Sequence, residues 1–84
     1  MRPVYVRQKE RRAGNGRPAT FWVSVDRGNG KPTFVSETFF DRHNANRAAR
    51  SFIALLDPHL DVVLIRWVGT VGTKSYRQVR EVIR

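Results

Sequence analysis

The chain has 84 residues, of which 40% are apolar, and 16 Lys and Arg against seven Asp and Glu give it a formal net charge of +9. The apolar share supports one small folded domain over residues 1–84 and excludes a disordered basic tail. Without cysteine the chain has no disulfide framework and no thiolate zinc site, and without a long apolar run it offers no membrane span or signal-peptide core, so we expect a cytoplasmic protein.

The first half of the chain is predicted to form strands. Residues 3–7 combine β-branched and aromatic side chains after a proline, whereas residues 10–18 follow no period and predict a long hairpin tip or a mobile loop. From Thr20 to Asp26 apolar and polar residues alternate, which is the clearest strand pattern here. Residues 28–32 then predict a tight reversal, and residues 33–39 the partner strand.

One main helix is predicted next. Asp41 is a suitable N-cap, because its carboxylate can accept hydrogen bonds from the open amides of the first turn. Apolar residues follow at helical spacing up to Leu56, and Asp57-Pro58 ends the helix, since the residue before a proline avoids the α conformation.

The last part of the chain is predicted to add a strand and a helix. Residues 61–68 read as a strand that is apolar on both faces, and the spacing of apolar residues between Tyr76 and Ile83 predicts a short second helix. The predicted order is therefore β-β-β-α-β-α. We expect an α+β domain in which a small antiparallel sheet of three to four strands is packed by one main helix.

Residues 20–56 contain a recognisable series of motifs. The aromatic strand Phe21-Trp22-Val23-Ser24-Val25 precedes a Gly-Asn-Gly-Lys reversal, the segment Ser36-Glu37-Thr38-Phe39, and then Asp41 and Ala45. This series resembles the arm-type DNA-binding domain of phage tyrosine integrases, which is a three-stranded sheet with one helix. It also looks like the YegP-like bacterial ββα family of unknown function.

The resemblance to the integrase domains implies a particular DNA-facing surface, because their sheet enters the major groove. The residues carried over to that surface are Trp22, Ser24 and Asp26, with Thr33 or Glu37 beside them. Here the sequence departs from the family pattern, since arginine is expected along this face and carboxylates repel phosphate. The departure counts against base-specific reading and leaves backbone binding by the flanking cations.

Three groups of cations are candidates for phosphate contact, because guanidinium groups fork onto phosphate and stack on bases. The first group lies in the N-terminal segment and comprises Arg2, Arg7, Lys9, Arg11, Arg12 and Arg17. The second is a row on the predicted helix formed by Arg42, Asn46, Arg47 and Arg50. The third comprises Lys74, Arg77, Arg80 and Arg84, which would also complement the negative end of the predicted second helix. Each group has an alternative interpretation as an ordinary solvated surface.

Trp22 and Trp67 are candidate stacking platforms for unpaired bases, although most aromatic residues of so short a chain must fill its core. No metal or catalytic site is predicted. Asp57, His59 and Asp61 cluster on a turn without the histidine spacing of a helical zinc site, and His43-Asn44 has no partner motif. We therefore expect neither a cofactor nor enzymatic activity.

The predicted function is non-catalytic binding of DNA or RNA through phosphate contacts on an Arg-rich surface. The alternative is a small phage or mobile-element accessory protein that binds and modulates an acidic host protein. A free edge strand, or exposed aromatic residues ringed by arginine, would favour that alternative. The sequence leaves open the choice between DNA and RNA, the oligomeric state, and the order of residues 8–19.

Overall fold

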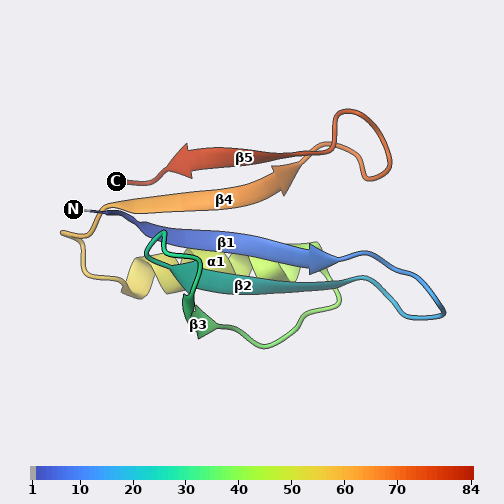
Figure 1. The fold of residues 1–84 in the computed structure, drawn as a ribbon, viewed down its shortest axis with the longest axis horizontal. Coiled ribbons are helices and arrows are strands. Elements are labelled where there is room, and N and C mark those ends of the chain that lie inside the picture. The colour runs from blue at the N-terminus through green and yellow to red at the C-terminus, as the bar shows by residue number, and fades with distance from the viewer. Residues whose placement is uncertain (1) are drawn as a thin grey trace.

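Two long antiparallel strands form the centre of the sheet in the computed structural model, which describes residues 2–84 (Figure 1). β1 (Val4–Arg11) pairs with β2 (Thr20–Asp26) along its whole length. The first strand is thus longer than the predicted residues 3–7, because the alternation of buried and exposed side chains continues to its end.

The loop that joins β1 and β2 extends beyond the rest of the sheet and forms one tip of the molecule (Figure 1). Asn15 and Gly16 have φ angles of 50° and 75°, the left-handed values that a two-residue hairpin turn requires. Gly14 and Arg17 close the turn through reciprocal backbone hydrogen bonds of 3.0 and 2.8 Å. We call residues 12–19 the hairpin tip, which is closed by an isolated β-bridge between Gly14 and Arg17.

The sheet has five strands in the order β3-β2-β1-β4-β5. β3 (Pro32–Val35) pairs antiparallel with β2, and β5 (Arg77–Val82) pairs antiparallel with β4 (Val62–Val68). β4 runs parallel to β1, because the helix α1 (Arg42–Leu55) returns the chain along the sheet before β4 begins. The sheet is therefore mixed and mostly antiparallel.

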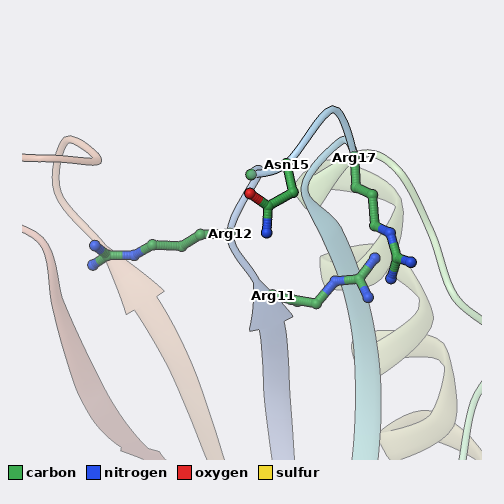
Figure 2. A pocket seen from close by; sticks show the side chains of 5 residues that line it. Arg11, Arg12, Asn15 and Arg17 are labelled. Carbon is green, nitrogen blue, oxygen red and sulfur yellow. The ribbon is translucent and has the colours of Figure 1, made fainter.

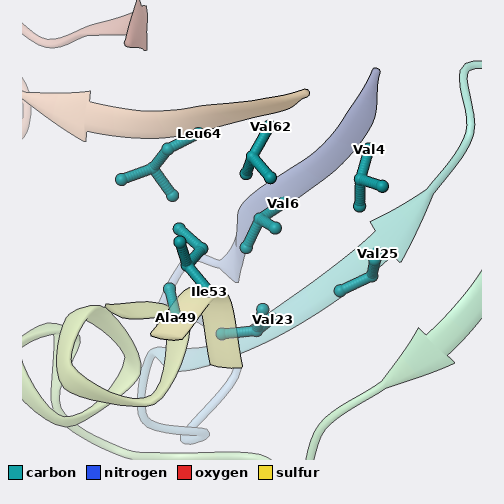
Figure 3. Close-up of a cluster of buried hydrophobic side chains, with 8 residues drawn as sticks. All are labelled: Val4, Val6, Val23, Val25, Ala49, Ile53, Val62 and Leu64. Atoms are coloured by element: carbon teal, nitrogen blue, oxygen red, sulfur yellow. The ribbon is translucent and has the colours of Figure 1, made fainter. Parts of the chain in front are cut away.

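The core lies between α1 and one face of the sheet (Figure 3). Asp41 caps the helix as predicted, its carboxylate accepting a 2.9 Å hydrogen bond from the amide of His43. The small residues Ala45 and Ala49 are buried on the side of α1 that faces the sheet, which lets the helix approach β1 and β2 closely. The buried apolar cluster comprises Val4, Val6, Val23, Val25, Ala49, Ile53, Val62 and Leu64.

The predicted α+β class with one main helix is confirmed, but the predicted second helix at the end of the chain is wrong. Residues 77–82 form β5, so the element order is β-β-β-α-β-β and the sheet has five strands. Valines at 79 and 82 favour extended backbone, and β4 otherwise presents an unpaired edge to solvent. The helix of residues 2–84 has neither the length nor the apolar composition to span a bilayer.

Candidate nucleic-acid interface

The face of the sheet opposite α1, which we call the open face, carries a row of cations on β1. Because Val4 and Val6 point into the core, the alternating residues Arg7, Lys9 and Arg11 point away from it. The cross-strand partners of these three cations are Ser24, Trp22 and Thr20. The surface that the resemblance assigned to β2 and a neighbouring strand is thus shared with three positive side chains of β1.

The carboxylate of Asp26, expected to repel phosphate on this face, is neutralised by Arg7. The Nε atom of Arg7 lies 2.6 Å from Oδ2 of Asp26, and the Asp26 side chain is only 7% exposed. The hydrogen bond from Arg7, helped by one from the amide of Gly28, holds the pKa of Asp26 below its usual value. The Arg7–Asp26 pair therefore carries no net charge of its own.

Glu37, another expected member of this face, lies elsewhere. Glu37 lines a groove between β3 and α1 together with Phe34, Phe52 and Leu55, on the helix side of the sheet. Thr33 donates its hydroxyl to the carbonyl of Val25, 3.2 Å away. Of these two residues, Glu37 is thus placed away from Trp22.

A positively charged hollow of about 430 Å³ lies at the hairpin tip. Its lining residues are Arg11, Arg12, Gly14, Asn15 and Arg17. Figure 2 shows the guanidinium groups of Arg11 and Arg17 on the same side of the ribbon, next to β2, whereas Arg12 points away from them. None of these three arginines lies within ion-pair distance of a carboxylate in the described part of the chain.

A second hollow, of about 320 Å³, surrounds Trp22 on the open face. The other residues that line it are Arg11, Thr20, Val35, Ser36 and Thr38. Arg11 lines both this hollow and the one at the hairpin tip. A partly exposed indole and a continuous set of unpaired cations are thus adjacent.

Arg42 of the helical row serves the fold. Arg42 lies 3.6 Å from Glu10, donates to the Tyr76 hydroxyl at 2.8 Å, and has its guanidinium over the Phe21 and Tyr76 rings. Burial, together with the hydrogen bond to Glu10, raises the pKa of Tyr76 and keeps the phenol neutral. Arg42 is therefore committed to holding α1 onto the sheet.

Other cations of the helix and C-terminal groups also have intramolecular partners. Arg50 forms a 3.0 Å ion pair with Glu81 on β5. Arg84 donates to the carbonyls of Leu56, Asp57 and Leu60, which closes the C-terminal end of α1. This role replaces the predicted complement to a C-terminal helix.

The structure thus separates the predicted binding residues into two groups. Lys9, Arg11, Arg17 and Trp22 lie together on the open face and at the adjoining hairpin tip, and Arg7 lies beside them in its ion pair. Arg42, Arg47 and Arg50 belong to α1, on the other face of the sheet. Arg12 lies at the hairpin tip but also lines a hollow on the helix side, with Phe21, Val71 and Tyr76.

Tyr5 on the open face was missed by sequence reasoning, and Arg80 was assigned to a predicted C-terminal helix. Tyr5 lies under the guanidinium groups of Arg7 and Arg80, 5.0 and 5.6 Å from its ring centroid. Arg80 reaches this face because it pairs with Ile65 across β4 and β5, which a C-terminal helix would not allow. The signal that could have found Tyr5 is its place in the same alternation as Arg7 and Lys9.

No protein-family model matches the chain, and neither the curated proteins nor the solved structures include a significant match. Within residues 2–84, no three His, Asp or Glu side chains come together as metal ligands.

Proposed function

We propose that this protein binds nucleic acid without catalysis, and that phosphates contact Lys9, Arg11 and Arg17 on the open face and hairpin tip. The observation that carries the proposal is that these cations converge on one side of the β1–β2 ribbon without carboxylate partners among the described residues. Like charges at close range repel each other, so an anionic ligand that bridges them gains favourable interactions with all of them.

The shape of the ribbon suits a polyanion. A two-stranded β-ribbon fits the major groove of a duplex, and a flat sheet face offers a track for a single strand. The motif resemblance of residues 20–56 to integrase arm-type domains supports the same class of ligand. Binding through phosphates is largely independent of sequence and strongly dependent on salt.

The experiment compares two triple variants with equal charge. Lys9→Ala/Arg11→Ala/Arg17→Ala removes the proposed contacts, whereas Arg2→Ala/Arg27→Ala/Lys31→Ala removes three cations at the opposite end of β2. Fluorescence anisotropy with labelled oligonucleotides is measured between about 50 and about 200 mM salt. For the wild type we expect log K against log[salt] to fall with a slope of about −3 if three to four phosphates are neutralised.

The first variant should lose most of this slope, by about 0.9 per lost contact on duplex and about 0.7 on single strands. The control variant should keep it to within about one contact. Equal losses in the two variants would show that only net charge matters, and a salt-independent affinity would refute the phosphate mechanism.

A second function, binding of a protein partner, is favoured by a different surface. Phe34 and Leu55 are 45% and 86% exposed, and they line the groove between β3 and α1 with Phe52. β3 is also an edge strand of the sheet, which is available for strand addition. Glu37, rather than arginine, borders this groove, so this surface does not select the acidic host protein expected from the sequence. Leu55→Glu should abolish binding of a protein partner at this groove and leave oligonucleotide binding unchanged.

A further inference from the structure

The two tryptophans of the chain differ in whether their rings are already stacked. The ring of Trp67 stacks on Tyr76 with a centroid separation of 5.0 Å and an interplanar angle of 13°. Trp22 makes no such aromatic contact within residues 2–84. It is partly exposed in the open-face hollow of about 320 Å³. One indole is thus part of the fold, and the other presents an unused stacking surface.

The rim of the Trp22 hollow offers groups that suit the edge of a base. In the described chain, the hydroxyls of Thr20 and Thr38 form no side-chain hydrogen bond, whereas that of Ser36 is occupied by the Val23 amide and the Glu37 carbonyl. A threonine hydroxyl both donates and accepts hydrogen bonds. The hollow therefore combines an aromatic platform with two unused polar groups, which matches the flat face and polar edge of a nucleobase.

The cations around Trp22 continue from the hollow to the hairpin tip. Lys9 is the cross-strand neighbour of Trp22, and Arg11 lines both the Trp22 hollow and the tip hollow that Arg17 completes. Extended backbone advances about 3.3 Å per residue along the strand, from Lys9 to the end of β1 at Arg11 and onward to the turn. Phosphates on either side of a base at Trp22 can therefore follow this row.

We propose that the Trp22 hollow holds one unpaired base of a single-stranded nucleic acid, whose backbone runs along Lys9, Arg11 and Arg17 toward the hairpin tip. This inference rests on the proposed function and specifies its substrate. Bases inside a duplex are stacked on their neighbours and cannot reach Trp22, so the hollow distinguishes single strands from duplexes.

The test uses Trp22→Leu and Trp22→Phe, which both keep an apolar side chain but differ in the aromatic ring. Binding is measured by anisotropy at low salt with oligothymidylate and oligouridylate of about 12 nucleotides, and with a duplex of equal length. Loss of stacking should weaken single-strand binding by Trp22→Leu by roughly 5- to 150-fold. Trp22→Phe should retain most of the affinity, and both variants should bind duplex like the wild type.

Fluorescence gives a second readout that does not depend on the fold of a Trp22 variant. In a Trp67→Phe background, Trp22 is the only tryptophan, and its emission should be quenched as the single strand is added and unchanged with duplex. The thymidylate and uridylate arms report whether DNA or RNA is preferred.

The outcomes separate the two proposals. The base-stacking inference would be overturned if Trp22→Leu weakened single-strand and duplex binding equally, or weakened neither. In that case, loss of binding in the Lys9/Arg11/Arg17 variant would still support phosphate contact. If the wild-type protein binds none of the three probes at low salt, both proposals fail.

Discussion

The ion pair between Arg7 and Asp26 should have opposite effects on stability and on binding. Asp26→Asn removes a carboxylate whose side chain is 7% exposed and leaves Arg7, 30% exposed, without its 2.6 Å partner. Hydrogen bonds to charged groups contribute about 1.5–3 kcal/mol, and the exposed part of Arg7 regains some hydration. We therefore expect the free energy of unfolding at neutral pH to fall by about 2 kcal/mol.

The stabilisation by the Arg7–Asp26 ion pair should depend on pH. Because pairing lowers the pKa of Asp26 from its usual 3.8, the stabilisation is complete above that value and is lost as the pH falls through the lower folded-state pKa. The difference in stability between wild type and Asp26→Asn should be constant from neutral pH to about pH 5 and should shrink below about pH 4. Urea denaturation at several pH values measures this difference.

A double-mutant cycle that combines Asp26→Asn with Arg7→Gln isolates the contribution of the ion pair. Glu37→Gln serves as the control, because Glu37 is an exposed carboxylate with no ion pair in the described structure. The control should change stability by less than about 0.5 kcal/mol. The same Asp26→Asn variant frees Arg7 for phosphate, so oligonucleotide affinity at low salt should rise and the salt slope should steepen by up to about 0.9. Unchanged stability together with unchanged affinity would refute the neutralisation argument.

Two further predictions concern the fold. Leu64→Ala should lower the free energy of unfolding by about 2–5 kcal/mol, because Leu64 is fully buried and its removal leaves a cavity. Val82 is 75% exposed, so the control Val82→Ala should change the free energy of unfolding by less than about 0.5 kcal/mol in the same urea titration. Gly69→Ala should lower the stability more than Gly72→Ala does. Both glycines have positive φ angles, 92° and 83°, and share a backbone strain of about 1–3 kcal/mol on substitution, but only the Cβ at position 69 would lie 2.1 Å from the backbone oxygen of Ser75. Equal thermal shifts in the two variants would contradict the predicted clash.

The strand β2, the reversal that follows it and the helix could be predicted from the sequence because their signals are local. Alternation in residues 20–26, the Gly28-Asn29-Gly30 turn and the capping carboxylate of Asp41 each act over a few residues. The end of the chain lacked such a signal. The apolar spacing from Tyr76 to Ile83 fits the helical period, and the strand is decided by the exposed edge of β4, which is a tertiary property.

The candidate site was predicted in its residue types but not in its grouping. Arg11 was assigned to a loop and Lys9 lay outside the predicted strand, although the alternation from Val4 to Arg11 continues without a break. The ion pairs that commit Arg42 and Arg50 to the fold depend on Glu10 and Glu81, which are distant in sequence. Local pattern reasoning has no access to such partners, so it could not separate structural arginines from available ones.

The hairpin tip separates the demands of folding from those of binding. Residues 12–18 are exposed, and the ribbon is held by the Asn15-Gly16 turn and by backbone hydrogen bonds between Gly14 and Arg17. The side chains of Arg12 and Arg17 are therefore not required for the fold, and their like charges oppose each other at low salt. Folding alone gives no reason for this accumulation of arginine, whereas an anionic ligand that neutralises it does.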